Sequence, residues 1–399
     1  MRTRTTRLLT ALAATALVVS LPGTAQARAA SDSPVTVTPG VTTTLTVTGH
    51  GWGHGHGMSQ YGARGAALAG LTSAQILAFY YPGTALAPLS ASIKVLITGD
   101  TDNNTTVLPE RGLRVRDLGN GRTYKLRTPH PPRVWRLVKV NGHTKVFYKT
   151  SRWHLYKTGG RRSLAGDGEF RSATGLLTLR LPTGDRVYRG ALRYSNRDTV
   201  NVLSIENYLK GVIASEMPAA WPAAALQAQA VAARTYAARE RADNLGDYYQ
   251  ICDTSACQVY RGVAGEQPQS NAAAAATAGQ VLTYGGQFAF AQFSSSNGGW
   301  SASGGQPYLV AQQDPYAGSA GDPNLNWTKQ VSVAALQAAY PAIGPLTSVQ
   351  ISGRDGDPTY GWVTSIVLTY QTGPQKTITG SAFKSLFGLK SANFSLSTP

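Results

Sequence analysis

The chain has 399 residues, with 37 Lys and Arg against 20 Asp and Glu, a formal charge of +17. A chain of this size can bury a large core in one or two domains, and a balance this basic attracts polyanions. No stretch beyond the first 30 residues is apolar for the roughly 18–20 residues that a membrane helix needs, which excludes the membrane-spanning class.

The N-terminus has the pattern of a secretory signal peptide, residues 1–27. Arg2, Arg4 and Arg7 form a basic region, an apolar run follows over Leu8–Leu21, and Ala25-Gln26-Ala27 is a small-x-small cleavage site. We therefore expect a secreted, cell-wall-associated protein with no nucleic-acid partner. Anionic wall polymers and wall-peptide carboxylates are the polyanions expected outside a cell.

Residues 28–48 read as a linker that runs into a first strand, because Thr and Val alternate around Leu45 and Val47. The next block, 49–70, reads GHGWGHGHGMSQYGARGAALAG and holds three of the six histidines. Its glycines allow backbone conformations closed to other residues and let a partner approach the main chain. A short helix over Gln75–Tyr81 and a strand over Ser92–Ile97 are expected to follow.

Residues 100–185 are expected to form a basic, β-rich insert. Within it, Arg111–Arg162 holds 15 Lys or Arg against one acid, Asp117. Asn141-Gly142 between two apolar-rich runs is a strong hairpin signal. The excess charge indicates either a binding surface for anionic polymers or an ordinary solvated face.

Residues 186–399 form the main predicted core, and one stretch in it carries a candidate acid. Glu216 lies between a strand-like apolar run, Val200–Ala214, and an Ala-rich helix expected to begin near Trp221-Pro222. The acid is either catalytic or an ordinary first-turn partner of the helix N-terminus. Beyond it we expect a helix over Asn271–Gly279, a strand over Gln280–Tyr284 and an ordered Ser/Gly-rich loop over residues 289–305. A hairpin, a helix and a final strand are expected in the tail.

Two other groups of residues could bind a ligand. Cys252 and Cys257 are the only cysteines, and in an exported chain such a close pair indicates a disulfide, with a metal pair as the alternative. His54 and His56 lack the helical i, i+4 spacing of a zinc protease and have no carboxylate between them, so zinc is disfavoured. The alternative is a Gly-rich loop that presents histidine and amide groups to a sugar chain.

The acid-base chemistry open to this chain is restricted. There is no Gly-x-Ser-x-Gly elbow, and neither cysteine has a cationic neighbour. A glycosidase with paired carboxylates needs a second acid, and the nearest, Glu206, lies in or at the end of the presumed strand. A single carboxyl is enough if the sugar supplies its own nucleophile. It must then have a raised pKa, which burial favours and a helix N-terminus opposes.

The run YLKGVIASEMPAAWPAAALQAQAVAARTYAAR resembles a signature of the stage II sporulation protein D/LytB (SpoIID/LytB) family. GWGHGHGMSQYGARGAA and CDTSACQVYRGV resemble further blocks of that family. In that family the Gly-His block follows the glutamate helix near the C-terminus, whereas here it comes first. The order resembles a circular permutation, which predicts that residues 49–61 lie beside both Glu216 and the C-terminal strand. Where the family commonly has Phe-His-Ser-Thr, this chain has Phe293-Ser294-Ser295-Ser296. The family's histidine is thus replaced by Ser294, which cannot take over a role that needs an imidazole.

The resemblance implies a peptidoglycan lytic transglycosylase that cuts MurNAc–GlcNAc bonds and leaves 1,6-anhydro-MurNAc ends without a cofactor. It assigns catalysis to Glu216, with Arg234 in support of charge or substrate. The same resemblance, with the loop argument above, gives the expected substrate-binding residues as His54, Gln60, Tyr61, Gln258 and Tyr260.

The fold expected is α+β, with a mixed sheet core, an Ala-rich helix after the catalytic loop and the basic β-rich insert. Residues 49–99 would supply the permuted first part of the SpoIID-like core. The main alternative function is a non-catalytic wall-binding protein that enhances a partner amidase. A zinc-dependent hydrolase is the third.

Overall fold

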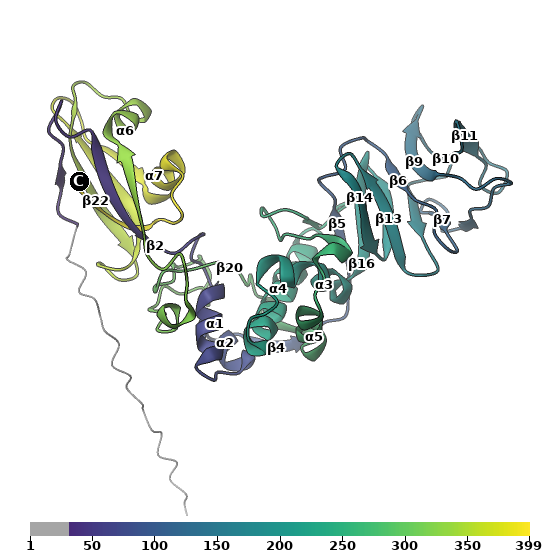
Figure 1. The fold of residues 1–399 in the computed structure, drawn as a ribbon, viewed down its shortest axis with the longest axis horizontal. Coiled ribbons are helices and arrows are strands. Elements are labelled where there is room, and N and C mark those ends of the chain that lie inside the picture. The colour runs from purple at the N-terminus through teal and green to yellow at the C-terminus, as the bar shows by residue number, and fades with distance from the viewer. Residues whose placement is uncertain (1–31) are drawn as a thin grey trace, which may run out of the picture. The chain divides into compact units, whose positions relative to one another are not determined.

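The computed structural model describes residues 32–399, and Figure 1 shows how their elements are arranged. The predicted signal peptide lies outside the described residues. In the part that is described, no helix is both long enough and apolar enough to cross a membrane. Helices and several separate sheets are combined in one chain, so the expected α+β class is confirmed.

A group of helices supports the candidate site (Figure 1). These are α1 (Gln60–Leu68), α2 (Ser73–Tyr80), α3 (Ile205–Glu216), α4 (Ala223–Asp243) and α5 (Pro268–Ala276). The Ala-rich helix is present as α4, with Pro222 as its N-cap. It packs against the other four, and fully buried alanines such as Ala230 and Ala233 allow that close approach.

The run Val200–Ala214 is not one strand, and this expectation was wrong. β16 ends at Ser204, whose side chain accepts a hydrogen bond from the Asn207 amide and so caps α3. The helix then continues to Glu216. Its buried side chains recur at helical spacing: Ile205, Tyr208, Leu209, Val212 and Ile213.

Two sheets contain most of the strands between residues 92 and 204. The seven-stranded sheet has the order β17-β5-β16-β15-β12-β7-β8, and the six-stranded sheet has the order β11-β10-β9-β6-β13-β14. Their strands are β5 (Ser92–Leu96), β6 (Thr105–Val107), β7 (Arg114–Asp117), β8 (Thr123–Lys125), β9 (Val134–Val140), β10 (His143–Lys149), β11 (Trp153–Tyr156), β12 (Gly168–Arg171), β13 (Leu176–Leu181), β14 (Gly184–Arg189), β15 (Ala191–Ser195), β16 (Asp198–Ser204) and β17 (Ile251–Cys252). Both sheets contribute to one hydrophobic core, with Trp135 and Leu179 from one and Val115 and Phe170 from the other.

The basic β-rich segment is continuous with its neighbours in the sheets. The seven-stranded sheet pairs β12, β7 and β8 of that segment with β15 and β16, which follow it in sequence, and β14 crosses residue 185. The Asn141-Gly142 turn joins β9 to β10, and both residues have positive φ, 50° and 79°. The exact limits 100 and 185 stay predictions.

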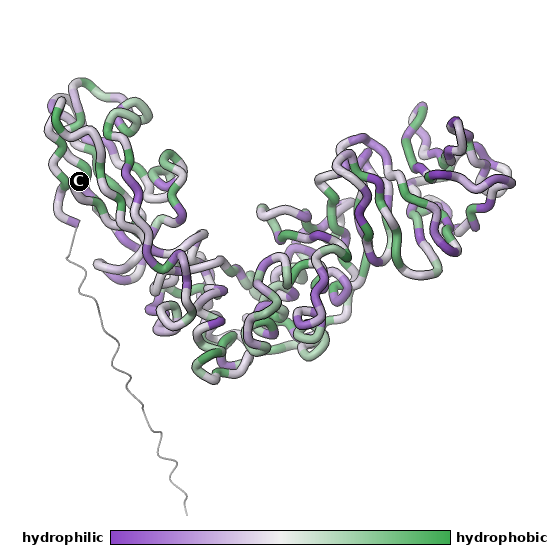
Figure 2. Tube along the Cα trace, in the orientation of Figure 1, coloured by the Kyte–Doolittle hydropathy of each residue, from purple (hydrophilic) through white to green (hydrophobic). Residues whose placement is uncertain are grey.

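The C-terminal part of the chain, together with residues 35–50, forms two sheets with a core of their own (Figure 1). One has the order β1-β22-β23-β24 and the other the order β21-β2-β25. The elements are β1 (Val35–Thr36), β2 (Thr44–His50), β21 (Trp327–Ser332), α6 (Val333–Ala339), β22 (Leu346–Asp355), β23 (Trp362–Tyr370), β24 (Lys376–Thr379), α7 (Gly380–Phe387) and β25 (Asn393–Ser397). Hydrophobic and hydrophilic residues lie side by side along these strands, as expected for sheets with one buried face (Figure 2).

Short strands link the Gly-His block to the helices. β3 (Met58–Ser59) pairs in parallel with β20 (Phe293–Ser294), which belongs to the Ser/Gly-rich segment 289–305. That segment is ordered, with Ser294, Ser296 and Asn297 buried. A further small sheet consists of β4 (Ala85–Pro88), β18 (Gln280–Tyr284) and β19 (Gln287–Phe288).

Candidate functional site

Glu216 is the last residue of α3, and the chain leaves the helix directly after it. Met217 is extended (φ −134°, ψ 132°) because the following Pro218 disfavours helical geometry at the residue before it. The carboxyl is held by the backbone: its Oε1 accepts a hydrogen bond of 2.8 Å from the Val259 amide. Glu216 thus ends one element and is fixed by another, 43 residues further on.

The surroundings of Glu216 favour its protonated form. Burial raises the pKa of the Glu216 carboxyl above its usual range, and the Val259 hydrogen bond and the charge of Arg261 only partly oppose this. A helix C-terminus carries the negative end of the dipole, so α3 gives the carboxylate no stabilisation. A helix N-terminus would have lowered the pKa of Glu216 and so opposed the effect of burial. At the C-terminal end of α3 this opposing effect is absent.

A cavity of about 420 Å³ opens beside Glu216. Glu216 is the sole carboxylic acid among the described residues that line it. The lining consists of Trp52, Gly53, His54, Gln60, Glu216, Tyr236, Ser255, Ala256, Cys257, Gln292, Phe293, Ser294 and Ser295. It combines aromatic rings, an imidazole and amide and hydroxyl groups, which suit a polar ligand with apolar faces.

The Gly-His block reaches this cavity because its backbone takes conformations that favour glycine. Gly51, Gly53, Gly55 and Gly57 all have positive φ, between 65° and 116°. A side chain at Gly57 would also collide with the carbonyl of Gln292. The alternation of glycine with other residues therefore lets the loop fold tightly while Trp52 and His54 reach the cavity.

The same block lies beside the C-terminal strand. β2 pairs antiparallel with β25, and His50 is opposite Asn393 in that register. His54 and Gln60 line one cavity with Glu216. This is the arrangement that the permuted order of the motifs predicts.

His54 is held neutral at the wall of the cavity. Its Nδ1 accepts a 3.0 Å hydrogen bond from the His56 amide, and the ring also bonds to the Phe293 backbone. Burial above all, together with the nearby His56 and Lys384, lowers the pKa of His54 to about 4. His54 is therefore a hydrogen-bonding group at neutral pH and carries no charge there.

The loop 53–56 also borders a second cavity, of about 520 Å³. Gly53 and His54 line both cavities, whereas His56, Trp362 and Lys384 line only the second. Lys384 donates a long hydrogen bond, 3.4 Å, to the Gly53 carbonyl. The loop 53–56 thus separates the two cavities, and Lys384 of α7 holds it in place through the Gly53 carbonyl.

The two remaining residues of the predicted loop set have different positions. Gln60 is 7% exposed and lines the first cavity. Tyr61 is absent from the lining, and its ring packs edge-on against Trp221 with 4.8 Å between centroids. Tyr61 therefore supports the connection between α3 and α4.

Arg234 does not line the cavity. Its position therefore gives it no direct contact with a substrate bound there. Its side chain is fully buried and forms a two-pronged ion pair with Glu206, at 2.9 Å for both bonds. It also donates to the carbonyls of Ala274 and Gln280. Arg234 instead fastens α4 to α3, α5 and β18 in the interior.

Gln258 and Tyr260 are likewise interior residues, 1% and 2% exposed. The Gln258 side chain donates to the Ala233 carbonyl and accepts from the Tyr208 hydroxyl. The Tyr260 hydroxyl donates to Asn201. Their contribution to the site is indirect, because they fix the backbone on both sides of Val259, which bonds to Glu216.

The structure joins Cys252 and Cys257 in a disulfide. In this form neither sulfur is a thiolate that could hold a metal. Within residues 32–399, no three His, Cys, Asp or Glu side chains come together as a metal-binding group. The bonded pair closes a short loop whose Ser255 and Ala256 line the Glu216 cavity.

Several cavity residues were not predicted from the sequence. Trp52 is 53% exposed and lies inside the recognised Gly-His block, which was the signal available for it. Tyr236 follows Arg234 by two residues in the same motif. Phe293 belongs to the Ser/Gly-rich segment 289–305, which was expected to be an ordered loop.

These observations define a class of protein: an α+β chain in which one half-buried carboxyl lies in a polar, aromatic-lined cavity. The family model described as stage II sporulation protein (SpoIID) matches residues 193–284, which include Glu216, Arg234 and the cysteine pair. The chain is 40% identical over 134 residues to an amidase enhancer of Bacillus subtilis (strain 168), covering 32% of this chain and 17% of that protein.

Two further relatives are named stage II sporulation protein D. The chain is 29% identical over 238 residues to that of Bacillus subtilis (strain 168), covering 53% of this chain and 64% of the relative. It is 30% identical over 232 residues to that of Bacillus amyloliquefaciens, covering 51% and 62%. The chain thus spans less than two thirds of the length of these relatives. The similarity to the SpoIID/LytB family thus covers part of this chain, with the family model matching residues 193–284.

Proposed function

We propose that this protein is a secreted lytic transglycosylase, which cleaves the MurNAc–GlcNAc bonds of peptidoglycan glycan strands with Glu216 as the acid and base. The observation that carries the proposal is the isolation of Glu216 in its cavity. Hydrolysis by two carboxyls requires a second acid some 5–9.5 Å away, and no other acid lines the described cavity. A substrate that supplies its own nucleophile removes that requirement.

The reaction needs only one proton carrier. Protonated Glu216 gives its proton to the glycosidic oxygen as the bond to C1 breaks. The resulting carboxylate then accepts the proton of the sugar's own 6-hydroxyl, whose oxygen bonds to C1. The products are a 1,6-anhydro sugar and a free hydroxyl end, Glu216 is again protonated, and no water is consumed.

Three features of the cavity support this assignment. The raised pKa of Glu216 keeps a proton available for the first step. Trp52 offers an exposed ring on which a sugar can stack, and neutral His54 and buried Gln60 offer hydrogen-bonding groups for sugar hydroxyls. None of these roles requires a metal or a cofactor.

The decisive experiment is mass spectrometry of purified glycan strands after digestion. We expect products one water lighter than those of hydrolysis, and their loss in Glu216→Gln. Glu110→Gln is a matched control, since Glu110 bonds to Thr178 at the six-stranded sheet and does not line the cavity. Hydrolytic products, or undiminished anhydro products from Glu216→Gln, would refute the proposal.

A second candidate function is enhancement of a partner amidase without bond cleavage. It is favoured by the 40% identity to a protein named amidase enhancer. In that case, added amidase releases more peptide from cell walls in the presence of this protein, and Glu216→Gln stimulates as well as the unaltered chain. Loss of stimulation in Glu216→Gln would argue against it.

A further inference from the structure

The outer side of the β9–β11 hairpin region carries an array of cations. Register partners point to the same side of a sheet, and Arg136 is opposite Phe147 while Lys149 is opposite Trp153. Lys145 belongs to the same side because it alternates with these residues along β10. The alternate positions Trp135, Leu137 and Val146 are buried in the core, so the cations lie on the outer side.

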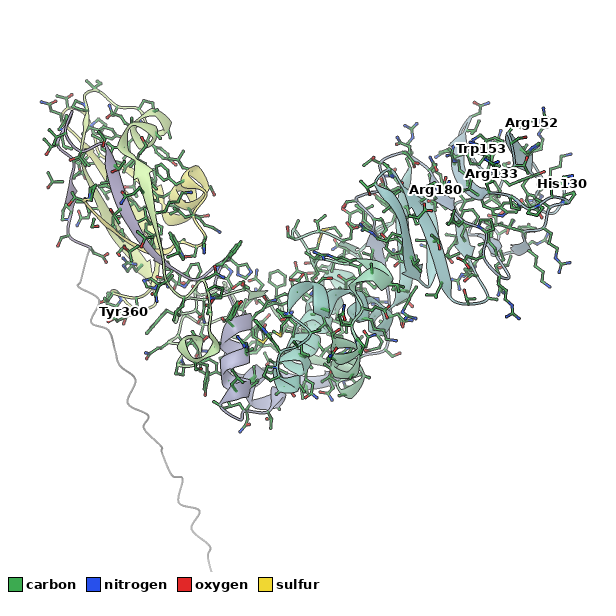
Figure 3. All side chains as sticks on the ribbon, viewed as in Figure 1. His130, Arg133, Arg152, Trp153, Arg180 and Tyr360 are labelled. Carbon is green, nitrogen blue, oxygen red and sulfur yellow. A yellow bond between two sulfur atoms is a disulfide. The ribbon has the colours of Figure 1, made fainter. Side chains whose placement is uncertain are left out.

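Three of the cations gather where the strands end. The Arg133 amide donates to the Lys149 carbonyl at 2.7 Å, and the Thr150 amide donates to the Arg152 carbonyl at 3.1 Å. These bonds place the backbones of Arg133, Lys149 and Arg152 next to one another, at the ends of β9, β10 and β11. We call the set Arg133, Arg136, Lys145, Lys149 and Arg152, together with Trp153, the basic sheet face. Figure 3 labels Arg133, Arg152 and Trp153.

The positive charge of this face is not balanced by ion pairs. Within residues 32–399, none of its five cations takes part in an ion pair. Asp117 is the one acid between residues 111 and 162. It is buried, and its carboxylate accepts hydrogen bonds from the amides of Gly119, Ala165 and Gly166. The nearest compensation is the attraction of Arg136 to Asp100 and Asp102.

The aromatic ring in the face holds cations in place. The Arg136 guanidinium lies 4.1 Å from the Trp153 ring centroid, and the Lys149 ammonium lies 5.8 Å from it. Arg136 is fixed further by a 2.9 Å bond to Thr106. A ring covered by a guanidinium is not free on that face for stacking with a nucleobase, so the surface is arranged to recognise charge.

We propose that the basic sheet face is a second binding site, which takes a phosphodiester-linked polyol polymer and acts independently of the Glu216 cavity. Guanidinium groups bind phosphate oxygens in pairs, and the unesterified oxygens of a phosphodiester accept from several donors at once. Arg133, Lys149 and Arg152, whose backbones lie next to one another, supply the donors of this site. A polymer that repeats this group releases bound counterions as successive phosphates engage the face.

The test measures binding of the full chain to poly(glycerol phosphate) by calorimetry at several salt concentrations. We expect Arg133→Gln/Lys149→Gln/Arg152→Gln to weaken binding by at least about tenfold. The slope of log affinity against log salt should fall by about two to three, near one for each phosphate that is no longer neutralised. The control Arg239→Gln/Arg241→Gln/Lys329→Gln removes the same charge from α4 and β21 and should bind like the unaltered chain.

Further arms separate this site from its alternatives. Trp153→Phe keeps the charge and an aromatic ring, and should reduce the change in tryptophan fluorescence on binding. Glu216→Gln should bind the polymer normally, so a failed glycan digestion does not affect this result. Equal binding by the triple variant and its control would overturn the proposal, as would tighter binding of a polyuronate or single-stranded DNA of equal charge density.

Discussion

The Val259 amide donates a hydrogen bond to Oε1 of Glu216 at 2.8 Å, and this single bond links the end of α3 to the segment after the disulfide loop. Gln258 and Tyr260, on both sides of Val259, are anchored in the core. The carboxyl is therefore held in a fixed orientation at the wall of the cavity. The motif residues near Cys257 act on the site through this backbone contact.

The pH dependence of cleavage should follow the protonation of Glu216. Because burial raises the pKa of this carboxyl, the active acid form persists to higher pH than for an exposed glutamate, and kcat/KM falls as the pH rises through that pKa. Arg261→Gln removes a charge that lowers the pKa, so it should move the falling limb to still higher pH. A pH profile of anhydro-product formation tests both shifts, and a limb unmoved by Arg261→Gln contradicts the second.

Trp52 should contribute to substrate binding and little to stability. Its side chain is 53% exposed, whereas its backbone is fixed by a 2.8 Å bond to Ser296. We expect Trp52→Ala to raise KM about tenfold, the loss of about 1.4 kcal/mol of stacking, with kcat and the free energy of unfolding nearly unchanged. Trp52→Phe should recover part of the loss.

The control for this experiment is Leu245→Ala. Leu245 is 58% exposed, just beyond the end of α4, and does not line the cavity. Its replacement should leave KM unchanged. A fall in kcat alone for Trp52→Ala would instead indicate that the ring orients the reacting sugar.

The sequence predicted a strand-like run over Val200–Ala214, whereas the structure has the end of β16 and most of α3 there. Ile205, Leu209 and Val212 are spaced as on one face of a helix, and Ser204 is an N-cap residue. The strand β16 runs into this helix without a Gly or Pro between them, so the two apolar runs read as one strand. By contrast, α4 and the β9–β10 hairpin have unambiguous local signals, a Pro-led alanine run and Asn-Gly.

The roles of site residues were harder to predict than their membership of motifs. Glu216 and Arg234 belong to one signature, yet Glu216 borders the cavity, whereas Arg234 is fully buried and pairs with the partly exposed Glu206. Which side of a helix faces a cavity depends on the elements packed around it, here α5 and β18. Local spacing carries no information on such distant contacts.

Arg234 should prove important for stability. Replacement by Met leaves the buried carbonyls of Ala274 and Gln280 without a donor and the partly exposed Glu206 without its cation, which should cost about 2–4 kcal/mol of the free energy of unfolding. Arg234→Lys keeps the charge but loses the two-pronged geometry, so its loss should be smaller. Denaturant unfolding measures both.

The matched control is Arg239→Met, whose pair with Asp243 is solvent-exposed on the same helix. It should cost no more than about 1 kcal/mol. Below its unfolding temperature, Arg234→Lys should retain kcat within about twofold. A large fall in kcat with unchanged stability would instead assign Arg234 to the chemistry.

The Cys252–Cys257 disulfide should shape the cavity as well as stabilise the fold. Closing so short a loop contributes about 2 kcal/mol through the entropy of the unfolded chain. Ser255 and Ala256, inside that loop, line the cavity, so Cys252→Ser/Cys257→Ser should also raise KM several-fold. Dithiothreitol should produce both effects in the unaltered chain and neither in the double variant. If the reductant lowers stability but leaves KM unchanged, the loop has no part in substrate binding.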